Sequence, residues 1–426
     1  MIQPIEDNVY AGLDLSVFDH NLELPRHRWY EFKEGFSPKL VHAAIDEMAS
    51  GSRRKLKLLD PFTGSGTTMV TAGQLGLEAM GVEVNPFLAF VARAKSTPNG
   101  WLLKDFQRRM SKIIDSSRHE IPSPLEGLST FTESTGVKKW LFNRSVLRGF
   151  TAIDAVLSAT GKYRNPLRLA LFASLMECCN AKRDGKCLRY KKDWESLGFT
   201  SASLKDVFVK RSQIIFDDVT KYNFEPDNIS VVRGDARKRL KNLPSGKYDL
   251  LVTSPPYLNS FDYSDVYRPE LFAGGFVRSN AELRQIRLKT VRSHVQVDWT
   301  PSKIISSPLI SPILSRLAEQ ELWSHKIPDM VQSYFSDMSE ILREAARAMR
   351  PRGRAWIVVS TSAYAGIEIP VDLILADIAT RNGWGLISVN VLRQMRAAGQ
   401  HWSHLQPGET HPLRESLIIL ERLSRR

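Results

Sequence analysis

Apolar and polar residues alternate in short blocks over the first hundred positions of the chain. In order, these blocks predict a strand at 57–60, a helix at 67–77, a strand at 79–85 and a helix at 86–95. A further helix is expected ahead of them at 36–48, with Ser37 as its cap and Pro38 in its first turn. Strands and helices that alternate with short loops predict a parallel α/β sheet.

The alternation stops after residue 96 and returns near residue 226. Residues 97–225 predict mostly helices, for example at 165–176. Beyond them the pattern predicts strands at 229–234 and 248–253, followed by an interruption at about 258–325. A long helix is then expected at 330–349, ended by Pro351-Arg-Gly353. After it come a strand at 355–360, a helix at 371–381, and strands at 386–391 and 415–420. We therefore expect about seven strands, mostly parallel, with helices on both faces of the sheet and a largely helical insertion.

These elements divide the chain into three segments. Residues 1–96 hold the N-terminal segment and the first half of the sheet domain, and residues 97–225 hold the helical insertion. Residues 226–426 hold the second half, with an inserted basic segment at about 258–325. A chain of 426 residues is long enough for one large domain with insertions or for two domains.

The net charge of the chain indicates a polyanionic partner. The chain has 59 Lys and Arg against 46 Asp and Glu, for a net charge of +13. A basic excess favours a polyanion such as nucleic acid, because neutralised phosphates release their counterions on binding.

Cysteine and histidine patterns argue against other classes of protein. Cys178, Cys179 and Cys187 form neither a disulfide framework nor a CxxC pair, and the nine histidines lack HExxH spacing, so no metal is expected. The N-terminus lacks the basic-then-apolar order of a signal peptide. No run approaches the roughly 18 apolar residues of a membrane span. We expect a cytoplasmic protein with no membrane partner.

The turn after the first predicted strand, residues 62–68, carries glycines at alternate positions. Gly64 and Gly66 permit a tight turn and a close approach of a ligand to the backbone. The turn opens a helix whose free N–H groups favour an anion. Met69 breaks the dinucleotide pattern GxGxxG, and no Lys follows Gly66 as a P-loop requires. Both nucleotide-binding patterns therefore fit poorly.

Two acidic residues follow the next strands. Glu83 ends the second strand, 19 positions after Gly64, and suits hydrogen bonds to both ribose hydroxyls of an adenosine. Asp235 follows the third strand and is placed to accept from an adenine amino group. Glycine turns and strand-end acids also occur in α/β proteins of other function, so the combination carries more weight than any one feature.

Three segments resemble the DNA amino-methyltransferases. Asp60-Pro-Phe-Thr-Gly-Ser-Gly-Thr-Thr68 is similar to their S-adenosylmethionine loop, DPF-x-GSGTT. Glu83-Val-Asn-Pro86 is similar to the acidic strand end that follows it, and Gly35-Phe-Ser-Pro38 resembles the motif over the methionine end of the cofactor. The resemblance implies a Rossmann-like methyltransferase sheet and S-adenosyl-L-methionine as cofactor. The implied cofactor residues are Phe36, Ser37, Asp60, Pro61, Phe62, Gly64, Gly66, Thr67, Thr68, Glu83, Val84, Asn85, Asp235, Ala236 and Thr253.

The fourth predicted strand ends in Thr253-Ser-Pro-Pro-Tyr257, which matches the family's (Asp/Asn/Ser)-Pro-Pro-(Tyr/Phe/Trp) hallmark. A strand merely ended by prolines is the simpler alternative. The hydroxyl of Ser254 and the carbonyl of Pro255 can accept the two hydrogens of an exocyclic amine and free its lone pair. The prolines fix φ and add no competing donor, and Tyr257 offers a face for a flipped base. Ser254, Pro255, Pro256 and Tyr257 are the expected catalytic residues.

The same motif narrows the reaction. Methylation of a pyrimidine ring carbon would need a cysteine nucleophile, typically after a proline, and none of the three cysteines follows one. By resemblance, Ser254 favours cytosine-N4 over adenine-N6, whose enzymes usually carry Asp or Asn there. We expect a site-specific DNA methyltransferase that acts on the N4 amino group of a flipped cytosine. Adenine-N6 is the nearest alternative, followed by an RNA guanine-N2 methyltransferase and a non-catalytic nucleic-acid-binding subunit.

Contacts to double-stranded DNA are expected from the insertions, and residues 97–225 are a candidate region for DNA binding and target recognition. Tyr263 lies in an aromatic segment that can wall the base pocket, although anchoring to the core fits equally well. Two basic runs can follow a phosphate backbone or be solvated faces, and their candidates are Lys182, Arg183, Arg189, Arg284, Arg287, Lys289 and Arg292. A polar loop at 401–414, with Arg393, Arg396 and His411, can face the site. In a restriction–modification system, a cognate endonuclease would be a further partner.

Overall fold

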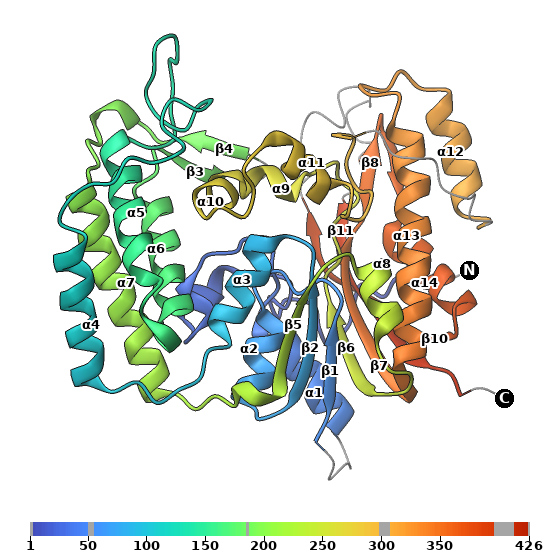
Figure 1. Cartoon of the computed structure of the whole chain (residues 1–426). Helices are drawn as coiled ribbons and strands as arrows, with labels where there is room; N and C mark the ends of the chain where they lie inside the picture. Colours follow the sequence, from blue (N-terminus) through green and yellow to red (C-terminus); the bar gives the residue numbers. More distant parts are fainter. Residues whose placement is uncertain (1–2, 50–54, 185–186, 298–306, 396–412, 425–426) are drawn as a thin grey trace.

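A seven-stranded sheet forms the centre of the molecule (Figure 1). The computed structural model describes residues 3–49, 55–184, 187–297, 307–395 and 413–424. The strands of the sheet are β1 (Lys57–Asp60), β2 (Glu78–Glu83), β5 (Ile229–Arg233), β6 (Tyr248–Thr253), β7 (Met349–Ser360), β10 (Trp384–Met395) and β11 (Leu413–Arg422). Their order is β10-β11-β7-β6-β1-β2-β5, and only the two pairings of β11 are antiparallel.

Helices cover both faces of this sheet because successive strand residues point to opposite sides. Leu58 packs in one apolar cluster with α1 (Pro38–Ala49) and α2 (Thr67–Gln74), whereas Leu59 packs in another with α13 (Ile327–Ala348) and α14 (Val371–Arg381). The backbone N–H of Lys39 donates to Ser37 Oγ at 3.2 Å, so Ser37 caps α1 as predicted. The expected Rossmann-like, mostly parallel sheet with helices on both faces is confirmed.

The helical insertion packs against α3 (Pro86–Lys95), at the left of Figure 1. Its main helices are α4 (Leu103–Ser116), α5 (Arg144–Leu157), α6 (Arg164–Glu177) and α7 (Ser201–Lys221). Phe87 of α3 and Phe172 of α6 pack edge to face at 5.1 Å, so the insertion and the sheet domain share one apolar core. The regular secondary structure of the insertion is mostly helical, as expected, except for a hairpin of β3 (Ala181–Asp184) and β4 (Cys187–Tyr190) in the basic run.

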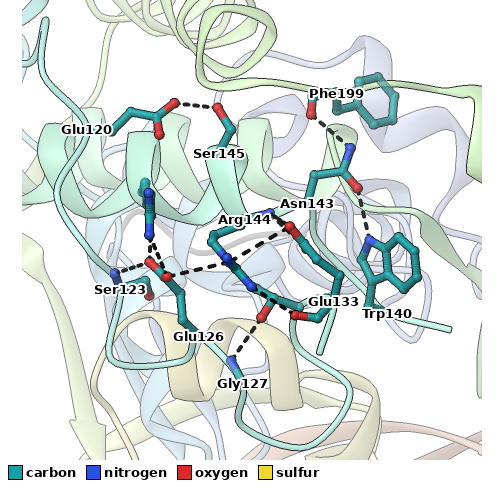
Figure 2. A network of polar contacts seen from close by, with 12 residues as sticks. Glu120, Ser123, Glu126, Gly127, Glu133, Trp140, Asn143, Arg144, Ser145 and Phe199 are labelled. Carbon is teal, nitrogen blue, oxygen red and sulfur yellow. Dashed lines mark hydrogen bonds and ion pairs between the residues drawn. The ribbon is translucent and has the colours of Figure 1, made fainter. Parts of the chain in front are cut away.

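A long loop between α4 and α5 is held to the start of α5 by polar contacts (Figure 2). Arg148 donates two hydrogen bonds to Glu126, at 2.8 and 2.9 Å. The backbone N–H of Arg144 donates to Glu133 at 3.1 Å, and Trp140 donates to Asn143 at 3.0 Å. These bonds give a loop that lacks helices and strands of its own a defined path over the surface.

The second half of the chain departs most from the expected boundaries at β7. The helix ends at Ala348 and β7 begins at once, so Pro351 lies inside a strand rather than at a helix end. The register of β7 against β6 shifts between Met349 and Arg354. A proline has no N–H for a strand ladder, and an irregularity of this kind accommodates it.

The remaining elements are short. They are α8 (Ala236–Arg239), α9 (Tyr263–Val266), α10 (Arg268–Ala273), α11 (Asn280–Arg287), α12 (Ile310–Ala318), the strands β8 (Ser362–Tyr364) and β9 (Ile367–Ile369), and the 3₁₀ turns η1 (Asp19–Glu23), η2 (His27–Trp29), η3 (Gly161–Tyr163), η4 (Trp194–Ser196), η5 (Pro226–Asn228) and η6 (Leu240–Asn242). Within the described ranges, no helix has the length and apolar character to cross a membrane.

A candidate active site at the ends of the parallel strands

The turn between β1 and α2 needs its two glycines. Gly64 and Gly66 adopt φ of +53° and +92°, in the left-handed region that side chains disfavour. A Cβ on Gly64 would lie 2.9 Å from the ring of Phe32, and one on Gly66 would lie 3.0 Å from Cβ of Ala92. Both the backbone conformation and the close packing therefore require glycine.

Asp60 joins this turn to the Ser-Pro-Pro-Tyr segment. Its Oδ1 accepts hydrogen bonds from the backbone N–H of Phe62 at 3.0 Å and from the hydroxyl of Thr253 at 2.6 Å. Burial raises the pKa of Asp60 to about 6. Because β1 and β6 are neighbours in the sheet, this bond connects two motifs that are 193 positions apart in the sequence.

Glu83 ends β2 beside the glycine turn. Its carboxylate accepts from the backbone N–H groups of Gly64 at 2.8 Å and of Asn85 at 2.7 Å. Burial raises its pKa to about 7. A carboxylate offers roughly four acceptor sites, and these two bonds do not use them all. Glu83 is thus held in place with capacity for a ligand.

Asp235 follows β5 and is bound by its neighbour Arg237. Oδ1 accepts from the backbone N–H and Nε of Arg237, each at 2.9 Å, and Oδ2 accepts from Nη2 at 2.9 Å. Arg237 also pairs with Asp337 of α13 at 2.9 Å. Arg237 thus orients Asp235 and takes three of the roughly four acceptor sites of its carboxylate.

The Ser-Pro-Pro-Tyr segment follows β6, and its tyrosine is anchored at both ends. The hydroxyl of Tyr257 donates to Oε1 of Glu415 at 3.0 Å, and its backbone N–H donates to the hydroxyl of Tyr263 at 3.4 Å. Glu415 also accepts from Arg393 at 2.6 Å and from Ser16 at 2.7 Å. Burial and the nearby Glu415 raise the pKa of Tyr257 well above its usual value, so the phenol stays protonated.

One cavity of about 320 Å³ brings these segments together. This volume lies within the usual range for small-molecule sites. The expected residues that line it are Phe36, Pro61, Phe62, Gly64, Thr67, Glu83, Val84, Asn85, Asp235, Ala236, Ser254, Pro255, Pro256, Tyr257, Tyr263 and Lys289. Ser37, Asp60, Gly66, Thr68 and Thr253 do not line it. They are buried behind the wall, where Ser37 caps a helix and the hydroxyl of Thr68 donates to the carbonyl of Val252 at 3.4 Å.

The basic residues expected to contact DNA differ in their surroundings. Arg287 pairs with Asp262 at 2.5 Å, Arg292 pairs with Asp337 at 2.6 Å, and the largely buried Arg183 pairs with Glu270. The exposed members of the set are Lys182, Arg189, Arg284 and Lys289. Arg396 and His411, and the polar loop from 401 to 412, lie outside the described residues.

Several cavity residues were missed by sequence reasoning. Phe32 and Glu34 come from the poorly periodic N-terminal segment, and His294 from the second insertion. Glu415 had a usable signal, because it opens a strand with the run 416–420 behind it. β11 is antiparallel, so its first residues meet the carboxyl ends of the parallel strands. Arg393 lines the cavity, as expected for a residue that can face the site.

The fold and this cavity define a methyltransferase-like site. A glycine turn, two strand-end acids and a Ser-Pro-Pro-Tyr segment surround one space at one edge of a Rossmann-like sheet. Within the described ranges, no three His, Cys, Asp or Glu side chains are grouped to hold a metal ion.

Comparison with known proteins points in the same direction. No family model matches the sequence. The chain is 26% identical over 406 residues to the type II methyltransferase M.AvaI of Nostoc sp. (strain PCC 7120 / SAG 25.82 / UTEX 2576), covering 88% of this chain and 82% of the relative. It is 25% identical over 471 residues to the type II methyltransferase M.BsoBI of Geobacillus stearothermophilus, covering 99% and 90%.

Among solved structures, the chain matches TrmN from Thermus thermophilus with a TM-score of 0.31 and 11% identity. The match covers 91% of this chain but 49% of TrmN, about half of its length. The similarity to the two type II methyltransferases extends over most of each chain.

Proposed function

We propose that this chain is an S-adenosylmethionine-dependent DNA methyltransferase that methylates the exocyclic N4 amino group of a cytosine flipped out of the duplex. The observation that carries the proposal is the shared cavity. Ser254 and Pro255 line the same space as Gly64, Glu83 and Asp235. A cofactor held by the second group would present its methyl group beside the first. The similarity to type II methyltransferases over most of the chain supports a DNA substrate.

The residues of the cavity fit S-adenosylmethionine. Glu83 would accept hydrogen bonds from the ribose hydroxyls, since its carboxylate is fixed by Gly64 and Asn85. The remaining acceptor site of Asp235 suits the adenine amino group. The N-terminal end of α2, reached through the glycine turn, favours the carboxylate of the methionine part. When bound, this cofactor supplies an electrophilic methyl group.

Ser254 and Pro255 would act on the base. An exocyclic amine is a weak nucleophile because its lone pair is delocalised into the ring. The Ser254 hydroxyl and the Pro255 carbonyl would accept the two amino hydrogens, which localises the lone pair on nitrogen. The nitrogen would take the methyl group as the carbon–sulfur bond breaks, and one amino proton would leave to solvent. The two prolines hold these acceptors rigidly. Tyr257, anchored by Glu415, presents its ring for stacking on the flipped base.

Serine at position 254 favours cytosine over adenine in this proposal. The test is incubation of the purified chain with labelled S-adenosylmethionine and unmethylated duplex DNA, and in a parallel reaction with RNA, followed by mass spectrometry of the nucleosides. N4-methylcytosine is the expected product. N6-methyladenine alone would overturn the choice of base and leave DNA methylation standing, whereas label in RNA but not in DNA would overturn the substrate.

The exposed basic residues Lys182, Arg189, Arg284 and Lys289 are proposed to contact DNA. The similarity to type II methyltransferases supports a role in a restriction–modification system, and we propose as a further partner a cognate endonuclease that would cut the same sites when they are unmethylated. If one of these residues contacts a phosphate, its replacement by alanine should make the DNA affinity less dependent on salt concentration.

A further inference from the structure

The β3–β4 hairpin has two chemically different faces. Lys182 is paired in register with Arg189, and Arg183 with Leu188. Directly paired residues share a face of a ribbon, and successive residues alternate between faces. The side chain of Arg189 is 69% exposed, whereas that of Arg183 is 10% exposed. Lys182 and Arg189 therefore form an outer basic face, and Arg183 belongs to an inner face.

The inner face is anchored by a buried charge network. The guanidinium of Arg183 forms an ion pair with Glu270 of α10 and a hydrogen bond to the hydroxyl of Tyr30 at 3.0 Å. Its Nε donates to the carbonyl of Val266 at 3.3 Å. The guanidinium also lies 4.4 Å from the centre of the Tyr267 ring. A buried, planar, multiply bonded guanidinium fixes the orientation of the ribbon.

The same network reaches the candidate active site. The hydroxyl of Tyr267 donates to Oε2 of Glu34 at 2.6 Å, and Glu34 lines the cavity. β4 also packs on α9, whose first residue, Tyr263, lines the cavity as well. Figure 1 shows the hairpin above α9 and α10. One side chain, Tyr267, thus separates the anchor of the ribbon from the wall of the cavity.

We propose that the β3–β4 ribbon is a sequence-reading element, with Lys182 and Arg189 contacting base edges in the major groove next to the flipped base. The proposal rests on the proposed function. The major groove admits a two-stranded β-ribbon, and Arg and Lys donate to guanine O6 and N7 there. The present partner of Arg189 is Asp184, in an exposed ion pair at 2.7 Å. Such a pair contributes little and is readily exchanged for a base.

The buried anchor of the inner face explains why this ribbon suits sequence-specific contacts to bases rather than non-specific contacts to phosphates. A site-specific enzyme must hold its reading residues at a constant position relative to the base it modifies. The Arg183–Glu270 pair provides that, because it ties the ribbon to α10 and, through Tyr267, to the cavity wall. A basic surface that only tracked phosphates would have no need of this link.

The test compares the full chain with a Lys182→Ala/Arg189→Ala variant on a duplex library with randomised positions. Methylated duplexes are recovered and sequenced, and S-adenosylmethionine affinity is measured by calorimetry. The unmodified chain should show one preferred context. The variant should lose discrimination by about tenfold or more at one or two positions of that context, with cofactor affinity unchanged.

A matched control removes two lysines elsewhere. Lys104 of α4 and Lys210 of α7 are exposed and do not line the cavity. Lys104→Ala/Lys210→Ala should keep the full sequence preference. An unchanged preference in the ribbon variant, even with a uniformly lower rate, would overturn the proposal, because it would indicate phosphate contacts or none. Failure of the unmodified chain to methylate any duplex would overturn the proposed function and the ribbon proposal together.

Discussion

Thr253 donates a 2.6 Å hydrogen bond to Asp60. The bond joins the end of β6, where the Ser-Pro-Pro-Tyr segment begins, to the end of β1, where the glycine turn begins. Both side chains are buried, and neither lines the cavity. They fix the distance between the part of the site that would hold a cofactor and the part that would hold a base. Their role is positioning, achieved through the residues that follow them.

Thr253→Val should therefore damage both stability and transfer. Valine has nearly the same shape but no hydroxyl, so the buried Asp60 carboxyl loses a donor. We expect the free energy of unfolding to fall by about 1–3 kcal/mol and the transfer rate to fall with it. Urea unfolding and single-turnover kinetics measure the two effects.

Thr253→Ser provides the control. Serine keeps the hydroxyl and loses one methyl group, which costs about 1 kcal/mol by burial alone. Its transfer rate should remain close to that of the unmodified chain. Equal rates for the valine and serine variants would show that the hydrogen bond does not position the site.

Substitutions at Ser254 and Tyr257 should impair methyl transfer and leave cofactor binding intact. Ser254→Ala removes a proposed acceptor for the amino hydrogens, and Tyr257→Ala removes the stacking ring. Each should lower transfer by about 100-fold or more, with S-adenosylmethionine affinity nearly unchanged in calorimetry. Tyr257→Phe keeps the ring and loses the hydrogen bond to Glu415. Its transfer rate should therefore lie between that of Tyr257→Ala and that of the unmodified chain. Full activity in both alanine variants would remove these residues from the mechanism.

The sequence predicted the residues on the glycine-turn side of the cavity better than the rest of its lining. Gly64 and Glu83 could be placed because a glycine turn and a strand-end acid occupy fixed positions relative to parallel strands. Glu415 was missed because the rule concerns carboxyl ends, and β11 runs the other way. Arg183 was assigned to DNA because a basic run does not show which residues face inward. That requires the strand alternation, whereas the sequence predicted mostly helices for residues 97–225.

The binding of S-adenosylmethionine should become tighter as pH rises from 6 to 8. Burial raises the pKa of Glu83 from 4.5 to about 7, so the ligand-free chain holds a proton there at pH 6 and has released most of it by pH 8. The protonated carboxyl has fewer acceptor sites for ribose hydroxyls. From the ionised fractions, affinity should increase by about tenfold over this interval. Calorimetry at pH 6, 7 and 8 measures it.

Glu83→Gln tests the assignment. Its affinity should be low and nearly independent of pH. In the unmodified protein, the stability of the ligand-free chain should fall as pH rises, whereas its affinity for S-adenosylmethionine increases. A carboxyl whose pKa is raised on folding stabilises the fold most below about 4.5, and that stability is lost as pH rises towards 7, by up to about 3 kcal/mol. Equal affinity of the unmodified chain at pH 6 and pH 8 would contradict the role of Glu83.

Two arginines of one hairpin should differ sharply in their contribution to stability. Arg183→Ala leaves the fully buried carboxylate of Glu270 without its cation, which should cost about 3–5 kcal/mol. Arg189→Ala breaks an ion pair with Asp184 whose side chains are 69% and 46% exposed, and should cost less than about 1 kcal/mol. Urea unfolding of the two variants measures the difference.

A double variant distinguishes the contribution of the buried Arg183–Glu270 charges to stability from the contribution of side-chain packing. Arg183→Met/Glu270→Leu removes both charges and keeps much of the apolar volume, so it should recover part of the stability lost in Arg183→Ala. The recovery should be incomplete, because the hydroxyl of Tyr30 bonds to both side chains and would lose both partners. If Arg183→Ala costs no more than Arg189→Ala, the inner face does not anchor the ribbon, and the link between ribbon and cavity fails with it.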